Sequence, residues 1–258
     1  MSTDTSHTPS RKAAARARIA ERRAAEAAAQ AAVERRRRTV VGAVVAAVVL
    51  VVALVAVVLV QTDRTSTDAA AVAPPGTTDG YAFAVGPADA PVTLDVYEDF
   101  QCPVCAQLEA TSGATLRSLV DAGTVRLRYR GMAFLDRAST TDYSTRALNA
   151  AAVVAESGTD AYRAFHDLLF ANQPAEGSAG LSDDQLVGFA AQAGATGDGV
   201  ASGIRDLRHG DWVAAATDQA SRDGVTGTPT VVVDGTTLDS TELTPEGIAA
   251  AVQAATAR

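Results

Sequence analysis

The chain has 258 residues, and 30 acidic against 22 basic side chains give it a formal net charge of -8. With 47% hydrophobic residues it is too apolar to be disordered throughout, and its length allows one large domain or two small ones. Residues 1–39 carry a net charge of +6 and the remainder -14, which argues against nucleic-acid binding by the acidic remainder. Because Cys102 and Cys105 are the only cysteines, a miniprotein held by several disulfides and a four-cysteine zinc site are excluded.

The N-terminal part predicts a membrane anchor. Residues 1–39 are a low-complexity mixture rich in Ala, Arg and Glu, which we interpret as a solvated basic cytoplasmic tail attracted to anionic lipid. Val40 to Val60 carries no charged or polar side chain, and as a helix rising ~1.5 Å per residue it is long enough to cross the ~30 Å core of a bilayer. Arg35–Arg38 precede this run, so the positive-inside rule places residues 61–258 outside the cytoplasm.

A cleaved signal peptide is the alternative to a permanent anchor. Its apolar region is normally ~7–15 residues and is followed closely by a small-residue cleavage site. Here the apolar run is longer, and the first such site, Ala71-Val72-Ala73, lies more than ten residues beyond it. No cysteine follows the run closely, which excludes a lipoprotein anchor. We therefore predict a single-pass signal-anchor, and a linker over 61–79, which is rich in Thr, Ala, Asp, Pro and Gly.

The folded region is expected to begin near residue 80 with a strand–helix–strand unit. Residues 92–97 are rich in β-branched side chains and predict a strand. Pro103 suits the first turn of a helix, which we expect to end at Gly123. Residues 125–130 alternate apolar side chains with arginines, which predicts a half-buried strand.

Helices are expected next, and a hairpin near the end of the chain. We expect Asp142, Asp160 and Ser182 to cap three helices, followed by two more around 200–207 and 212–220. Farther on, Asp234-Gly235 separates 230–233 from 236–238, which predicts a β-hairpin with a two-residue turn. Thr244 and Pro245 then predict the cap and first residue of a last helix.

The two cysteines, in the sequence Cys102-Pro103-Val104-Cys105, lie where the predicted strand meets the predicted helix. This spacing brings the sulfurs close enough for a disulfide, and the first cysteine faces the helix N-terminus, where N–H groups and the macrodipole favour an anion. That position lowers the pKa of the Cys102 thiol and makes it the attacking thiolate. Cys105, one turn inside the helix, is expected to resolve mixed disulfides.

Other interpretations of the pair are weaker. A structural disulfide of this spacing closes a very small loop and constrains the unfolded chain little. A zinc site needs further ligands, and His166 and His209 show no paired spacing, so we expect no metal site. An exported setting lacks a glutathione pool, which suits an exchanging disulfide. The pattern therefore favours redox chemistry.

Three segments resemble one family. The run from Ala88 to Cys105 resembles the DsbA-like branch of the thioredoxin superfamily, and Gly224 to Thr230 resembles its cis-proline loop. Tyr162 to Phe170 resembles its inserted helical subdomain. The resemblance implies an α/β thioredoxin fold over 80–258, with a helical insert at about 135–209.

The resemblance also implies a substrate-binding loop. It implies a cis bond between Thr228 and Pro229, with this loop lying against Cys102 and contacting substrate. A proline at a strand start leaves neighbouring backbone free to pair with an incoming peptide. An ordinary turn proline is the alternative that the residues alone leave open.

The chain departs from the family pattern at two positions. Many DsbA-type enzymes carry histidine before the second cysteine, whereas this chain has Val104, which cannot donate a hydrogen bond. Family members often place a buried acid six residues before the first cysteine, and here that position is Val96, with Asp95 on the opposite strand face. We expect Glu98 and Asp99 to be solvated loop charges. His166, His209 and Trp212 are interpreted as surface or packing residues.

The sequence therefore predicts a membrane-anchored, extracytoplasmic protein thiol–disulfide oxidoreductase. Cys102 and Cys105 are its redox centre, separated by the active-site dipeptide Pro103-Val104, and no bound cofactor is expected. The expected partners are exported proteins with cysteines and a membrane reoxidant, and nucleic acid is not among them. Oxidation of substrates is favoured, with a disulfide reductase or isomerase on the same fold as one alternative. A non-catalytic thioredoxin-like module that binds peptides is the other.

Overall fold

The computed structural model describes residues 71–258. The predicted basic tail, the predicted transmembrane helix over 40–60 and the first ten residues of the predicted linker lie outside the described residues. Between residues 71 and 258 no helix is both long and apolar enough to cross a bilayer.

The folded domain begins earlier than we expected, because the predicted linker over 61–79 includes a strand. Strand β1 (Thr77–Thr78) pairs antiparallel with β2 (Ala82–Val85). The Thr77 backbone N–H and hydroxyl both donate to the carbonyl of Pro74, which closes the turn before β1. The end of the linker is therefore part of the sheet.

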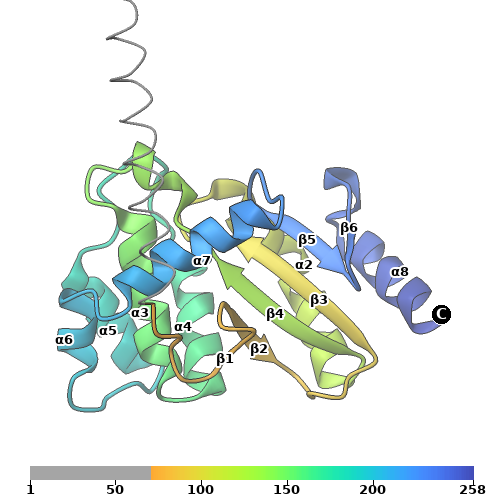
Figure 1. Ribbon diagram of the computed structural model, residues 1–258, viewed down its shortest axis with the longest axis horizontal. Coiled ribbons are helices and arrows are strands. Elements are labelled where there is room, and N and C mark those ends of the chain that lie inside the picture. Colours follow the sequence, from red (N-terminus) through yellow and green to blue (C-terminus); the bar gives the residue numbers. More distant parts are fainter. Residues whose placement is uncertain (1–70) are drawn as a thin grey trace, which may run out of the picture. The chain divides into compact units, whose positions relative to one another are not determined.

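A six-stranded mixed sheet forms the centre of the domain, in the order β1-β2-β4-β3-β5-β6 (Figure 1). Its other strands are β3 (Val92–Glu98), β4 (Val125–Gly131), β5 (Thr230–Val233) and β6 (Thr236–Thr237). Strands β3 and β4 are parallel, while every other neighbouring pair is antiparallel. Helix α2 (Pro103–Asp121) connects the parallel pair, so the predicted strand–helix–strand unit is confirmed.

The burial of β3 and β4 follows from their positions in the sheet. Strand β3 is buried on both faces, as expected of a central strand covered on both sides. In β4 the apolar positions are buried and the three arginines are half-buried, so the predicted alternation is confirmed. Arg128 and Arg130 both pair with Asp95 on β3, at 2.5 and 2.6 Å. Asp95 therefore lies on the face of β3 that carries the arginines of β4, opposite to the face of Val96, as predicted.

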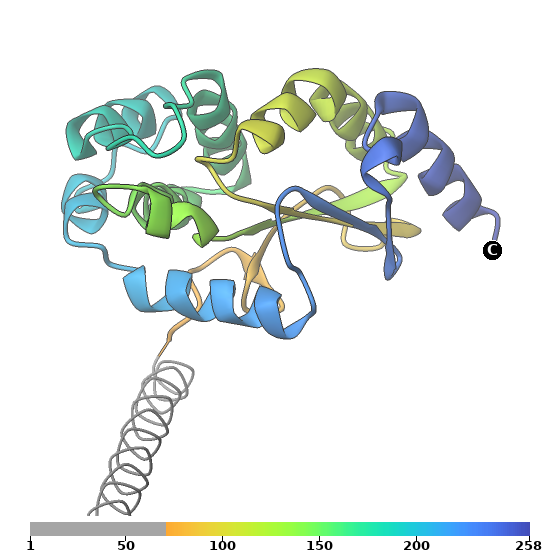
Figure 2. The same cartoon turned by 90° about the horizontal axis from the view of Figure 1, so that it is seen from above.

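Helices cover both faces of the sheet. Helices α2 and α8 (Pro245–Thr256) lie on one face, and α7 (Gly210–Arg222) lies on the other (Figure 2). Trp212 on α7 is 1% exposed, its ring meets Phe83 edge-on, and its Nε1 donates to the carbonyl of Gly80 at 2.7 Å. The predicted packing role of Trp212 is therefore confirmed.

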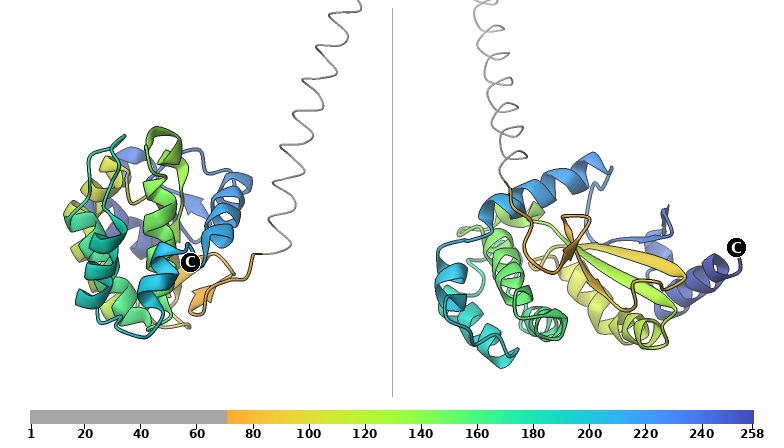
Figure 3. Two further views of the ribbon diagram at one scale, coloured as in Figure 1. Left: turned by 90° about the vertical axis from the view of Figure 1, so that its left-hand side faces the viewer. Right: turned by 60° about the horizontal axis from the view of Figure 1, so that its bottom comes forward.

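A layer of helices stands beside the sheet, in the region predicted as an insert (Figure 3). It contains a 3-10 helix η1 (Phe134–Ala138), then α3 (Tyr143–Ala155), α4 (Thr159–Ala171), α5 (Asp183–Gln192) and α6 (Val200–Arg205). Ser182 caps α5 by accepting from the N–H of Gln185, as predicted. Asp142 is the N-cap residue of α3, as predicted, although its side chain makes no cap bond. The cap predicted at Asp160 is wrong, because Gly158 is the N-cap residue of α4.

The C-terminal elements agree with their predictions. Asp234 and Gly235 both have positive φ, 46° and 79°, as a two-residue turn that follows the twist of the strands requires. The Thr244 hydroxyl accepts from the N–H of Gly247, and Pro245 is the first residue of α8. The hairpin places β5, and the loop before it, beside β3.

Candidate active site

Cys102 stands at the junction between β3 and α2. It is the N-cap of the helix, with extended backbone angles, and its carbonyl accepts from the N–H groups of Cys105 and Ala106 at 3.1 and 3.2 Å. Pro103 is the first helical residue, where its missing N–H leaves no hydrogen bond unmade. The sequence therefore places Cys102 at the N-terminus of α2, as predicted.

The Cys102 thiol is acidic. Hydrogen bonding from the Cys105 thiol, with further bonds from the N–H groups of Cys105 and Val104, lowers the pKa of Cys102 from 9.0 to about 6, although burial opposes the shift. Thiolate is consequently the main form of Cys102 at neutral pH. Because thiolate is the species that attacks a disulfide, Cys102 is the nucleophile of the pair.

Cys105 has the opposite environment. It is 1% exposed, and burial, followed by the hydrogen bond to Cys102, raises the pKa of its thiol far above the ordinary value. Both cysteines are free thiols in this structure. Cys105 therefore remains protonated until the Cys102 thiolate has formed a disulfide with another sulfur and lost its charge. This is the order of events that a resolving cysteine requires.

The loop before β5 lies against the nucleophile. The Cys102 sulfur is 3.4 Å from the carbonyl oxygen of Thr228, a residue 126 positions later in the chain. The peptide bond between Thr228 and Pro229 is cis, so this expectation is confirmed. Both residues are half-buried, which leaves part of the loop accessible beside the thiol.

A groove of about 580 Å³ opens beside the cysteines. Val104 of the active-site dipeptide lies on its wall and is 55% exposed. The other lining residues come from α2, the cis-proline loop and the segment that leads into α8: Gln107, Leu108, Thr111, Thr228, Pro229, Ser240, Leu243, Thr244, Pro245 and Glu246. The groove thus brings Val104 of the active-site dipeptide and the predicted substrate-binding residues Thr228 and Pro229 to one surface.

The segment between β3 and Cys102 is held by a buried carboxylate. Asp99 is 0% exposed and accepts from the N–H of Gln101, the N–H of Leu135 and the hydroxyl of Ser144, at 2.8, 3.0 and 2.6 Å. Burial raises the pKa of Asp99 to about 6, against these three bonds, so the carboxyl is ionised at neutral pH. Our expectation of a solvated charge is wrong, because the helical insert covers this segment.

The insert also contacts the active-site backbone directly. The Gln173 side chain, just after α4, donates to the carbonyls of Phe100 and Cys102 at 3.1 and 2.9 Å. The bond to Cys102 fixes the first turn of α2 from outside the helix. Sequence reasoning missed Gln173, because nothing in its local sequence distinguishes it from a surface glutamine.

Glu98 is also buried, and the expectation of a solvated charge is wrong for it too. Its Oε1 lies 2.8 Å from Nε2 of His166, and both residues are 1% exposed. Burial alone would lower the pKa of His166, but the Glu98 carboxylate and its neighbours raise it to about 10. The imidazole is packed by the rings of Tyr129 and Phe170, so the packing role predicted for His166 is confirmed, with an ion pair added.

His209 lies apart from these groups. Its Nε2 is 2.7 Å from Oε1 of Glu156, and its backbone N–H donates to the side chain of Asn149. The pair fixes the start of α7 against α3, which agrees with the structural role predicted for His209.

The pH dependence of alkylation tests the assignment of the two thiols. In the reduced protein we expect Cys102 to react with iodoacetamide with a midpoint near pH 6, and its rate to fall about tenfold per pH unit below that. Cys105 should stay unmodified across this range, because its thiol is buried and its pKa is raised. Peptide mapping of the modified protein measures both rates, and faster modification of Cys105 would reverse the assignment.

Comparisons with known proteins agree with this geometry. A family model described as thioredoxin matches residues 78–254. Oxidised DsbA of Mycobacterium tuberculosis is 32% identical, with a TM-score of 0.60 over 69% of this chain and 93% of that chain. The reduced disulfide bond oxidoreductase DsbG of the same organism is 32% identical, with a TM-score of 0.61 over 72% and 91% of the two chains.

One curated relative is a much longer protein. The Na(+)/H(+) antiporter NhaA 3 of Salinispora tropica is 35% identical over 150 residues, which are 58% of this chain and 21% of the antiporter. The chain thus spans about a fifth of the length of that relative. The family model and both mycobacterial structures, in contrast, extend over most of the described domain. The chain therefore belongs to the DsbA-like thiol–disulfide oxidoreductases of the thioredoxin superfamily.

Proposed function

We propose that this enzyme oxidises pairs of cysteines in exported proteins, working outside the cytoplasm from a membrane anchor. Its redox centre is the Cys102–Cys105 pair itself, with no bound cofactor. The observation that carries the proposal is the acidic Cys102 thiol at the N-terminus of α2, beside the carbonyl of Thr228 and the groove.

The proposed reaction transfers two electrons in two exchanges. A substrate thiolate attacks the Cys102 sulfur of the enzyme disulfide. This attack forms a mixed disulfide between the substrate and Cys102 and releases the Cys105 sulfur, which takes up a proton. A second substrate thiolate attacks the substrate sulfur of the mixed disulfide, which releases Cys102 as thiolate and leaves a disulfide in the substrate. The enzyme pair has then gained the two electrons, and a membrane reoxidant of disulfide or quinone chemistry removes them.

The pKa of Cys102 supports the oxidising direction. The folded value, about 6, lies below the ordinary value of 9.0, so the reduced enzyme gains stability as the pH rises through 6 and loses it as the pH falls through 6. At neutral pH this gain is on the order of 1 kcal/mol, and it makes the disulfide form a stronger oxidant. A low thiol pKa also makes Cys102 the better leaving group in the second exchange.

The groove supports a protein substrate. The groove and the exposed Val104 on its wall offer an apolar surface to an extended peptide. Thr228 and Pro229 on its wall are the residues we propose to contact the substrate backbone next to the reacting cysteine. The anchor and the orientation are supported by the apolar run from Val40 to Val60 and the arginines before it.

A complementation experiment tests activity and location together. In cells that lack their own disulfide-forming oxidase, we expect the full chain to restore an exported reporter enzyme that is active only with its disulfide formed. A variant without residues 40–60 should restore nothing, because the domain then stays where its substrates are absent. A full chain that reaches the membrane and does not restore the reporter would overturn the oxidising direction. Equal restoration by the deletion variant would overturn the proposed anchor.

A further inference from the structure

Three ionisable side chains meet on the far side of α2 from the groove. They are Glu98 at the end of β3, Glu109 on α2 and His166 on α4, and one ligand-type atom of each lies within 4.8 Å of the others. The catalytic cycle proposed above makes no use of them. Their chemistry, two carboxylates and one imidazole, is that of a site for a divalent transition metal.

Two carboxylate oxygens in this cluster have no protein partner. Oε2 of Glu98 and Oε1 of Glu109 are buried and form no hydrogen bond within the described part of the chain. Glu98 is 1% exposed, and its other oxygen faces His166. Because an unpaired buried carboxylate oxygen is costly, these two atoms point to a cation that they would share.

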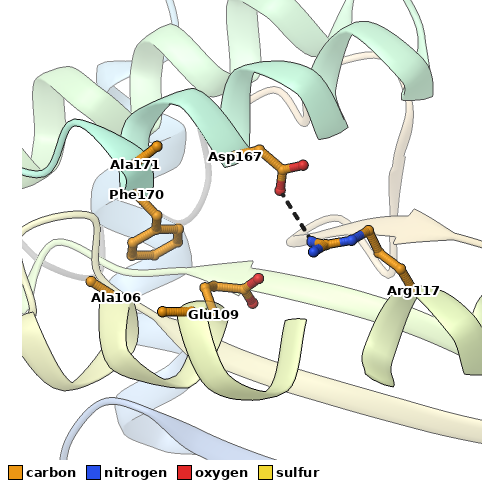
Figure 4. A pocket seen from close by; sticks show the side chains of 7 residues that line it. Ala106, Glu109, Arg117, Asp167, Phe170 and Ala171 are labelled. Carbon is orange, nitrogen blue, oxygen red and sulfur yellow. Dashed lines mark ion pairs between the residues drawn. The ribbon is translucent and has the colours of Figure 1, made fainter. Parts of the chain in front are cut away.

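A cavity of about 330 Å³ between α2 and α4 is lined in part by Glu109, one member of the cluster (Figure 4). The Glu109 carboxylate projects into it, and Arg117 and Asp167 face each other across it at 3.6 Å. Asp167 Oδ1 also lies 3.7 Å from Nδ1 of His166. Asp167 therefore lies on the Nδ1 side of the ring, while Glu98 lies at Nε2, so acidic groups face both ring nitrogens.

We propose that Glu98, Glu109 and His166 bind one divalent transition-metal ion, of which zinc is the best match. His166 would supply Nε2 and the two glutamates one oxygen each, while a water from the cavity would complete four ligands. The present 2.8 Å contact between Glu98 and His166 opens to admit the ion, and the imidazole gives up its proton. The two carboxylates together balance the charge of the divalent ion. Without the ion, the Glu98–His166 pair neutralises only one of the two carboxylates.

The proposed site differs from the metal-free chain expected from the sequence. That expectation considered cysteine and histidine spacing alone, and it treated Glu98 as a solvated charge. The site requires only one histidine, because β3 and α2 bring two carboxylates to it.

Zinc titration of the full chain tests the proposal. The protein is first oxidised, so that both cysteines are held in their disulfide and cannot bind zinc. We expect one equivalent of zinc to bind in competition with a chromophoric chelator, and to raise the Tm of the wild-type protein. Glu109→Gln and Glu98→Gln should each weaken binding by about tenfold or more, since each removes one charged ligand.

His209→Gln is the matched control. His209 pairs with Glu156 at 2.7 Å, at the start of α7, and neither residue belongs to the cluster. Zinc affinity should be unchanged in this variant. The proposal is overturned if micromolar zinc neither binds to nor stabilises the oxidised wild type, which can be measured even where a variant fails to fold. It is also overturned if a folded Glu109→Gln variant binds as tightly as the wild type, or if His209→Gln loses binding equally.

Discussion

Replacing Cys105 with serine is expected to remove the enzyme disulfide and to leave Cys102 joined to exported proteins in disulfides that persist. The Cys102 thiolate of this variant attacks a disulfide of an exported protein, which is the reverse of the second exchange proposed above, forms a mixed disulfide and releases the other sulfur as a thiolate. Serine at position 105 cannot attack that bond, so the adduct persists. We expect turnover to fall by at least about 10³-fold, the range associated with loss of a catalytic nucleophile.

Electrophoresis without reductant measures the adducts, which should disappear when a reductant is added. Cys102→Ser is the matched control: it retains the buried thiol of Cys105, which is 1% exposed, and should form no adducts. If the Cys105→Ser protein is folded and binds exported proteins only non-covalently, the domain is a peptide-binding module and the proposed function fails.

The second large effect is expected on stability, from Asp99→Ala. This change leaves the N–H groups of Gln101 and Leu135 and the hydroxyl of Ser144 without their acceptor in a buried position. Each buried donor left without an acceptor costs about 1–3 kcal/mol, so the loss of all three bonds should cost about 3 kcal/mol or more of the free energy of unfolding. Ser144→Ala removes one of the three bonds and should cost about 1 kcal/mol.

Urea unfolding at pH 7 measures these losses, and the fluorescence of Trp212, the only tryptophan in the chain, reports the transition. Asp160→Ala provides a control, because this exposed carboxylate lies in the first turn of α4 and should contribute no more than about 1 kcal/mol. A loss below 1 kcal/mol for Asp99→Ala would show that the three donors find other partners.

Local sequence signals were sufficient for the elements that carry the thiols. Pro103 fixes the start of α2, and the apolar run before it fixes β3, so the position of Cys102 follows from neighbours within a few residues. The hairpin at Asp234-Gly235 was likewise predictable, since a two-residue turn with positive φ at both positions has a strong residue preference.

The surroundings of the thiols could not be predicted in this way. Glu98 and Asp99 have the composition of a solvated loop, and their burial depends on partners 36 to 68 positions away: Leu135, Ser144 and His166. Strand β1 was missed because two threonines carry no periodicity, and the side chain of Asp142 makes no cap bond because its backbone is left-handed, with φ of 50°. Long-range packing decides each of these features.

The bonds from the helical insert to the active-site segment bear on how such a domain can be shortened. The insert is one continuous stretch of sequence, and by that criterion it could be exchanged as a cassette. Deleting it, however, would remove the Leu135 and Ser144 donors to Asp99, and the Gln173 amide from the carbonyls of Phe100 and Cys102. A minimal version of this enzyme therefore needs new donors at positions facing Asp99 and Cys102, and trimming the chain to its sheet and covering helices does not provide them.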